Sequence, residues 1–127
     1  MTTTKGVILV MDDDASFCEV MKEILTELGY NSTFVNSGEK AIASYKQSHQ
    51  MKKPFDLVIL DLKMDKGING EETANRLLQI NPKIKIVISS GFSNLSIITD
   101  YRKHGIKAVL LKPYNVNKLK KLLNEII

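Results

Sequence analysis

The feature that most constrains the fold is a fivefold alternation of short apolar runs with segments whose apolar residues recur at helical spacing. Two of the runs are VILVM at 7–11, which is too short and too rich in β-branched residues to be a helix, and FDLVILDL at 55–62. Both carry apolar side chains on both faces, as expected of strands buried on both sides of a sheet. Short strands that alternate with helices of about 10–15 residues indicate parallel βαβ units.

The same pattern predicts where the elements lie. The predicted strands span residues 7–11, 30–36, 55–62, 84–90 and 107–111. The predicted helices are residues 14–28, a segment that begins at Ser37 or Gly38, a segment around 73–78, a weaker helix at 95–104 and a final helix at 116–126. With right-handed crossovers, five parallel strands give an α/β three-layer sandwich of the (βα)5 type. The flavodoxin-like strand order 2-1-3-4-5 is common at this size, so we expect it here.

Length and composition fit one globular domain. The 127 residues, 43% of them hydrophobic, are enough for a sizeable core, and we expect residues 1–127 to form a single domain. No apolar run is long enough to span a membrane and MTTTKG at the N-terminus has no apolar signal region, so we expect a cytoplasmic location without membrane contact. Cys18 is predicted to be a packing residue rather than a reactive thiol. The net charge of +4 comes from scattered lysines without interleaved aromatic residues, so nucleic-acid binding is not expected.

Three consecutive acids, Asp12 to Asp14, directly follow the first predicted strand. At about 5 Å and an effective dielectric near 20, each pair of like charges costs roughly 3 kcal/mol, which selection for stability alone does not explain. An acid at a helix N-cap accounts for one or two of them, because it accepts backbone N–H bonds and suits the helix dipole. A bound cation is the alternative, because it would neutralise the clustered carboxylates.

Three further strands of the predicted sheet also end in polar residues. These residues are Asp61, Ser89, Ser90 and Lys112. Because the carboxyl ends of parallel strands meet at one edge of a sheet, we expect these side chains to converge with Asp12 and Asp13. Carboxylates and a backbone carbonyl suit Mg²⁺, which keeps several waters and uses few protein ligands. A lysine and a hydroxyl beside a metal-binding carboxylate indicate a phosphoryl site, and an aspartate can itself accept the group as an acyl phosphate.

Four short motifs in this order resemble the receiver domain of response regulators in two-component signalling. They are DD after the first strand, LVILDL with its aspartate, ISSG after the fourth strand and LLKPY after the fifth. Each motif alone is common, but the four together at the ends of alternate elements are specific, and the resemblance covers nearly the whole chain. It implies a regulatory domain, not an enzyme beyond self-phosphotransfer and self-dephosphorylation, that takes a phosphoryl group from a histidine kinase or a phosphotransfer protein.

The resemblance also implies a role for each acid of the predicted site. Asp61 would accept the phosphoryl group. Asp13 and Asp61 would bind Mg²⁺ directly, together with the backbone carbonyl of Lys63, and Asp12 would help through a water molecule. Asp14 lies one place beyond the acid pair of the family, so we assign it to the helix cap.

The same resemblance implies roles for the polar residues after the last two strands. Ser90, rather than its neighbour Ser89, would be the switch hydroxyl, because it directly precedes the small residue Gly91. Lys112 would pair with the phosphoryl oxygens, and the Lys112–Pro113 peptide bond would be cis.

The chain departs from the commonest receivers in two places. Asp65 follows Met64 where many receivers have proline, and the loop reaches Gly70 one residue later than usual. This longer loop resembles the receivers of hybrid sensor histidine kinases, which implies that the domain comes from, or is related to, such a protein. The second departure is Val109, because many receivers carry a mobile Tyr or Phe there. Coupling would then run through Ser90 and the loop after the fourth strand, with Tyr101 and Tyr114 as alternative contributors or as half-buried packing residues.

The expected function is a switch in which phosphorylation of Asp61 changes what the face formed by residues 95–126 binds. The sequence does not identify the output partner or determine whether phosphorylation drives dimerisation. An alternative from another class is a Mg²⁺-dependent phosphatase with an aspartate nucleophile, although such enzymes want a second acid where this chain has Lys63. A further alternative is a receiver-like binding module that no longer takes phosphate.

Overall fold

The computed structural model describes residues 4–91 and 96–127 and contains one parallel five-stranded sheet. Its strands are β1 (Val7–Met11), β2 (Asn31–Val35), β3 (Leu57–Asp61), β4 (Ile86–Ser90) and β5 (Ala108–Leu111). Their order is β2-β1-β3-β4-β5 and every neighbouring pair is parallel, which confirms the predicted flavodoxin-like arrangement. Each strand begins and ends within two residues of its predicted bounds.

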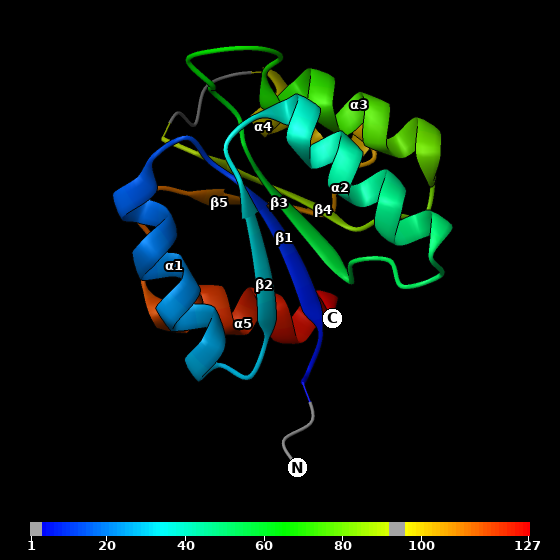
Figure 1. Ribbon diagram of the computed structural model, residues 1–127. Coiled ribbons are helices and arrows are strands. Elements are labelled where there is room, and N and C mark those ends of the chain that lie inside the picture. Colours follow the sequence, from blue (N-terminus) through cyan, green and yellow to red (C-terminus); the bar gives the residue numbers. More distant parts are fainter. Residues whose placement is uncertain (1–3, 92–95) are drawn as a thin grey trace.

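Helices cover both faces of the sheet and make the three layers (Figure 1). The helices are α1 (Ala15–Glu27), α2 (Gly38–Gln50), α3 (Gly70–Ile80), α4 (Ser96–Thr99), the 3-10 helix η1 (Tyr101–His104) and α5 (Val116–Ile126). α1 and α5 lie on one face, and α2, α3 and α4 lie on the other (Figure 1). Within the residues that the structure describes, no helix is long and apolar enough to cross a membrane.

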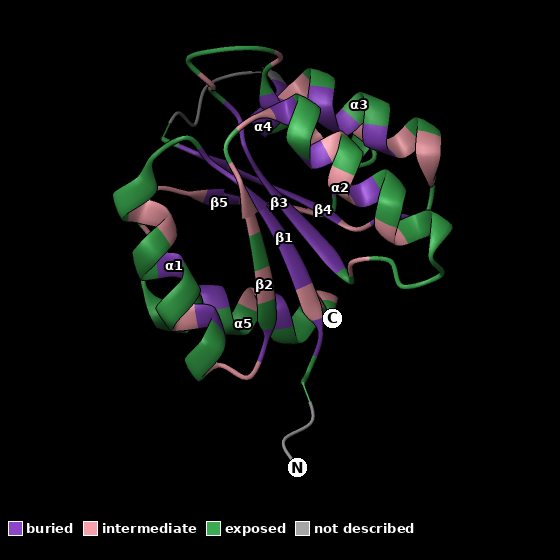
Figure 2. Ribbon diagram, in the orientation of Figure 1, coloured by how far each residue is buried: buried purple, intermediate pink, exposed green. Residues whose placement is uncertain are grey.

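The core consists of two apolar clusters, one on each face of the sheet, because successive side chains of a strand point to opposite faces. Along β3, for example, Ile59 packs with the α1 and α5 side and Leu60 packs with the α2 and α3 side. The three central strands are buried almost throughout (Figure 2). The apolar runs of the sequence therefore belong to strands covered on both faces, as expected.

The four long helices begin at short polar residues that cap them. Asp14, Ser37, Asn69 and Asn115 each accept a hydrogen bond from the backbone N–H three residues later. Such caps satisfy donors that have no partner inside the helix. The capped helices hold the loops at the carboxyl edge of the sheet in place.

The predicted helix at 95–104 is wrong as a continuous element over residues 96–104, and residue 95 lies outside the described residues. The chain forms α4, turns at Asp100 with φ −113° and ψ 27°, and continues as the 3-10 helix η1 up to Gly105. Ile97 and Ile98 are both buried in the core. Their β-branched side chains crowd the preceding helical turn, which disfavours a longer helix here.

Two apolar residues that recur at helical spacing in the sequence face solvent in the structure. Val20 of α1 is 57% exposed and Val116 of α5 is 43% exposed. Met21 and Leu25 fill the α1 side of the core, so the buried stripe is narrower than the apolar pattern indicates.

Candidate functional site

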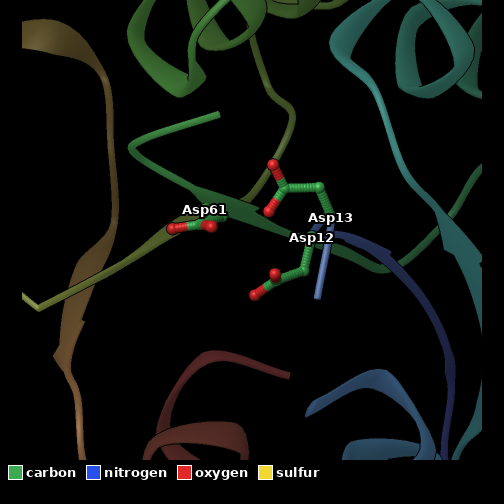
Figure 3. Close-up of side chains that lie close together, drawn as sticks. All are labelled: Asp12, Asp13 and Asp61. Carbon is green, nitrogen blue, oxygen red and sulfur yellow. The ribbon is translucent and has the colours of Figure 1, made fainter. Parts of the chain in front are cut away.

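Three carboxylates gather at the carboxyl edge of the sheet, where β1 and β3 lie side by side (Figure 3). Asp12 and Asp13 directly follow β1, and Asp61 is the last residue of β3. One ligand oxygen from each of the three lies within 4.8 Å of the other two. Asp12 and Asp61 are buried, at 3% and 9% exposure, whereas Asp13 is exposed. The predicted convergence of these acids is therefore present.

The three consecutive acids have three different partners. Asp12 Oδ1 accepts a 2.9 Å hydrogen bond from the backbone N–H of Asp14, and Asp14 itself caps α1, as predicted. Asp13 Oδ2 accepts a 3.0 Å bond from the backbone N–H of Asp65, which ties the β3–α3 loop to the end of β1. This contact of the loop was not predicted, because it depends on how residues 62–69 turn back across the site.

Lys112 supplies the positive charge of the site. Its Nζ lies 3.1 Å from Asp12 Oδ2 and 3.7 Å from Asp61 Oδ1. The ammonium also lies 4.5 Å from the centre of the Phe17 ring, a favourable cation–π contact. The Lys112–Pro113 peptide bond is cis, as predicted.

The charge balance of the site favours a cation. Burial, together with the Asp12 charge, raises the pKa of Asp61 from 3.8 to about 6, and Lys112 opposes the rise. One lysine thus does not compensate three clustered acids. The number of carboxylates, their closeness and the raised pKa fit a hard divalent cation with oxygen ligands. Lys63 follows β3 at the same edge, and its backbone N–H is near enough to lower the pKa of Asp61.

Ser89 and Ser90 are both buried at the end of β4 but belong to opposite faces of the sheet. Ser89 pairs in register with Asp61 on β3 and with Leu110 on β5, which places it on the α1 and α5 side. Ser90 pairs with Leu111 and belongs to the α3 and α4 side. The assignment of Ser90, rather than Ser89, as the switch hydroxyl stays a prediction.

Backbone hydrogen bonds hold this edge of the sheet together. The Leu62 N–H donates to the carbonyl of Ser89 at 3.0 Å, and the Lys112 N–H donates to the carbonyl of Ser90 at 2.7 Å. Gly70, the first residue of α3, donates to the Leu62 carbonyl, and a Cβ at this glycine would overlap the backbone of Asp61. A glycine is therefore required where α3 begins against the strand that carries Asp61.

Two residues that line the site belong to the packing layer beneath it. Cys18 donates from Sγ to the carbonyl of Asp12, and burial, with the neighbouring acids, raises the pKa of its thiol to about 11. The thiolate is thus disfavoured, which agrees with a packing role. Tyr114 meets Phe17 edge to face with 6.1 Å between ring centres. Its position could not be read from the sequence, because it depends on the path of the chain after Pro113.

Comparison with known proteins identifies the class. The family model of the response regulator receiver domain matches residues 8–124, so this chain belongs to the response-regulator receiver family of two-component signalling. The transcriptional regulatory protein ZraR of Salmonella typhimurium is 33% identical over 118 residues, which cover 93% of this chain and 25% of that protein. The chain thus spans about a quarter of the length of the first curated relatives that it matches.

Two Thermotoga maritima proteins match over nearly their full length. The chemotaxis protein CheY is 28% identical over 120 residues, which cover 94% of this chain and 95% of that protein. The response regulator protein TrrA, solved in complex with Mg²⁺ and BeF, is 29% identical, with a TM-score of 0.81 and coverage of 96% and 99%. Receiver domains of this family bind Mg²⁺ at an acidic pocket, and the acid cluster of this chain provides a matching donor set.

Proposed function

We propose that this chain is a phospho-accepting switch in which Asp61 takes a phosphoryl group from a histidine kinase or a phosphotransfer protein. The observation that supports it most is the convergence of Asp12, Asp13, Asp61 and Lys112 at one edge of the sheet. Three acids around one lysine leave a negative site that binds a cation, and the lysine supplies a charge for an incoming anion.

In the proposed reaction, a carboxylate oxygen of Asp61 attacks the phosphorus of a phosphohistidine. An O–P bond forms, the P–N bond breaks, and the imidazole of the donor keeps the electron pair and can take up a proton. The product is an acyl phosphate, a covalent intermediate that suits a carboxylate nucleophile. Ionised Asp61 is required, and a cation bound beside it would favour that ionised form.

We assign Asp13, Asp61 and the carbonyl of Lys63 as direct Mg²⁺ ligands, with Asp12 acting through water. When bound, Mg²⁺ supplies positive charge that screens the carboxylates from the phosphoryl oxygens. Lys112 contributes on the other side. Its ammonium contacts Asp12 and Asp61 before phosphorylation and can exchange them for the phosphoryl oxygens afterwards, because all three lie within reach of one flexible side chain.

The switch itself runs through β4, α4 and β5 in this proposal. Phosphorylation adds about −1.5 to −2 charges at Asp61, and this charge attracts the hydroxyl of Ser90. Movement of Ser90 shifts the α4 side of the sheet, where Ile97 and Val109 pack in the same cluster. Because Val109 has no ring to rotate, we expect the α4 segment rather than a strand side chain to change position.

The phosphoryl donor has an apolar surface available beside the site. A groove between α1 and the β5–α5 loop is lined by Phe17, Val20, Met21, Ile24, Lys112, Pro113 and Tyr114. The exposed Val20 has no role in the core, and Lys112 links the groove to Asp61. A donor that brings a histidine to Asp61 would bury this apolar surface.

The wider setting belongs to the proposal as well. We expect residues 1–127 to act as a single receiver domain in the cytoplasm, without contact with membrane or nucleic acid. The long β3–α3 loop favours the receiver part of a hybrid sensor histidine kinase, with a single-domain regulator as the alternative.

The test is the intact mass of the protein after incubation with acetyl phosphate, with and without Mg²⁺. Wild type should gain about 80 Da only when Mg²⁺ is present, and Asp61→Asn should gain nothing. Asp56→Asn is a matched control, because Asp56 contacts the backbone of Val7 at the other end of β3 and should label normally. No gain in folded wild type, from acetyl phosphate or from a phosphorylated donor, would favour a phosphate-independent binding module instead.

A further inference from the structure

Two buried hydroxyls on the α1 and α5 side of the site have no hydrogen-bond partner among the residues that the structure describes. They are the Oγ of Ser89, in a residue only 1% exposed, and the phenol oxygen of Tyr114. Buried hydroxyls are normally hydrogen-bonded, because leaving one unpaired costs stability. An unpaired pair at the edge of a functional site therefore indicates a partner that is present in another state of the protein.

The geometry puts Ser89 beside the proposed phosphoryl acceptor. Ser89 and Asp61 are register partners on adjacent strands, so their side chains leave the same face of the sheet next to each other. Lys112, two residues beyond the Leu110 that pairs with Ser89, belongs to this face as well and contacts Asp61. A phosphoryl group on Asp61 would thus have Lys112 and Ser89 on the same side.

Tyr114 lies close to Ser89. Burial, together with the charges of Asp12 and Asp61, raises the pKa of the phenol to about 12, and interaction with the Ser89 hydroxyl opposes the rise. The two hydroxyls are thus neighbours, although their oxygens do not have the geometry of a formed hydrogen bond. The ring of Tyr114 packs edge to face against Phe17, which restricts where its hydroxyl can lie.

Both hydroxyls can donate, and each lacks an acceptor. Phosphorylation of Asp61 would create strong anionic acceptors at this place, and a hydrogen bond to a charged oxygen is about twice as strong as one between neutral groups. A simple packing role explains the pair less well, because Ala or Val at Ser89 and Phe at Tyr114 would fill the same space without unpaired hydroxyls.

We propose that the Ser89 hydroxyl donates a hydrogen bond to the phosphoryl group on Asp61 and that Tyr114 is a positioning residue that donates to Ser89 Oγ. The inference rests on the proposed function of Asp61. It adds a second hydroxyl on the opposite face of β4 from Ser90. Ser90 is the last residue of β4 and responds by moving, whereas Ser89 lies one residue inside the strand and stabilises the group where it forms.

The test measures binding of beryllium fluoride, a phosphoryl analogue, in the presence of Mg²⁺, together with the Tm of each variant with and without it. The variants are Ser89→Ala, Ser89→Cys, Tyr114→Phe and the Ser89→Ala/Tyr114→Phe double variant. Tyr30→Phe is the matched control, because Tyr30 is buried in the same cluster away from the site. Ser89→Cys keeps nearly the same size but donates poorly.

The expected effects have opposite signs in the two states. Without the analogue, Ser89→Ala should unfold at the same Tm as wild type or higher, because it removes an unpaired buried hydroxyl. With the analogue, Ser89→Ala and Ser89→Cys should bind roughly tenfold more weakly or worse. Tyr114→Phe should weaken binding less, and its effect should vanish in the Ser89→Ala background.

Each result decides between the two proposals. Wild type that neither binds the analogue nor gains mass at Asp61 overturns the proposed function, and this inference with it. Wild type that binds normally, with unchanged binding in both Ser89 variants, overturns the inference alone. A lower Tm of Ser89→Ala in both states, by the same amount, also overturns it, because that result indicates a packing role.

Discussion

The two parts of the chain that build the site differ in the length of their helices. The acid-bearing segment (residues 7–80) contributes Asp12, Asp13 and Asp61, and its helices α1, α2 and α3 have 13, 13 and 11 residues. The β4–β5 segment (residues 86–112) contributes Ser89, Ser90 and Lys112, but between its strands, within the described residues 96–107, α4 and η1 have four residues each. The strands that carry the carboxylates thus connect to long capped helices, whereas short helices join the strands that carry the hydroxyls and the lysine.

This difference suits a switch. A phosphoryl acceptor and its cation ligands must keep their geometry, which long helices packed on central strands provide. A responding element needs two arrangements of similar free energy, and short helices with few intrahelical hydrogen bonds are cheaper to rearrange. The comparison therefore predicts that the acid-bearing segment contributes more to the free energy of unfolding and that the β4–β5 segment changes conformation on phosphorylation.

The largest expected effect compares one buried side chain from each segment. Leu77→Ala in α3 should lower the free energy of unfolding by about 2–5 kcal/mol, because Leu77 is fully buried between long elements that cannot close the cavity. Ile97→Ala in α4 should cost less, because the short helix can move into the space. Urea unfolding of both variants measures the difference, and equal losses would contradict the contrast between the segments.

The second prediction concerns the acids alone. Mg²⁺ should raise the Tm of wild type, corresponding to about 2.7 kcal/mol at 100 times the dissociation constant, because it binds only the folded site. Asp13→Asn should remove most of this rise, since Asp13 is a proposed direct ligand. The measurement is the Tm at Mg²⁺ concentrations from about 10 μM to about 10 mM. Calcium-free EDTA buffer provides the zero point, and an unchanged rise in Asp13→Asn would remove Asp13 from the ligand set.

Most of the acid-bearing segment could be predicted from the sequence, because its signals are local. Apolar runs mark the strands, and polar caps such as Asp14 mark where helices begin. The parallel order then brings Asp12 and Asp61 to one edge without any knowledge of loops. The contact of the Asp65 N–H with Asp13 could not be predicted, because it depends on a loop path that no periodic pattern describes.

The β4–β5 segment was harder to predict for a physical reason. Its apolar pattern at 95–104 is compatible with one weak helix, but the chain turns at Asp100 and continues as the 3-10 helix η1. The unpaired hydroxyls of Ser89 and Tyr114 could not be predicted from the sequence either. Their closeness, about 25 positions apart in the chain, depends on the turn after Pro113. Tertiary packing determines the structure of this segment, whereas local sequence patterns determine that of the acid-bearing segment.

The third prediction uses the raised pKa of Asp61. An acid whose pKa is about 6 in the folded protein and 3.8 in the unfolded chain holds its proton more tightly when folded. Protonated Asp61 therefore stabilises the metal-free protein fully below pH 3.8, and this contribution is lost as the pH rises through about 6. Asp61→Asn cannot ionise, so its Tm advantage over wild type should grow from pH 4 to pH 7 in EDTA.

The size of this pH effect should be smaller than the effect of Mg²⁺, because the Asp61 side chain keeps some contact with solvent and Lys112 offsets part of the charge. Saturating Mg²⁺ should reverse the order of the two proteins at pH 7, since only wild type has the third carboxylate. A Tm difference that does not change with pH in EDTA would mean that Asp61 ionises normally in the folded protein.

The smallest predicted effect separates the cap from the cation site among the three consecutive acids. Asp14→Ala removes the hydrogen bond from the Phe17 N–H to Oδ1 and should lower the free energy of unfolding by about 1 kcal/mol. The Mg²⁺-dependent rise in Tm should stay as in wild type, because Asp14 is not among the acids that converge. Asp14→Asn is the control, since asparagine caps a helix equally well and should restore stability. If Asp14→Asn instead weakened the response to Mg²⁺, the charge of Asp14 would belong to the cation site, and the division of the three acids between cap and metal would have to be redrawn.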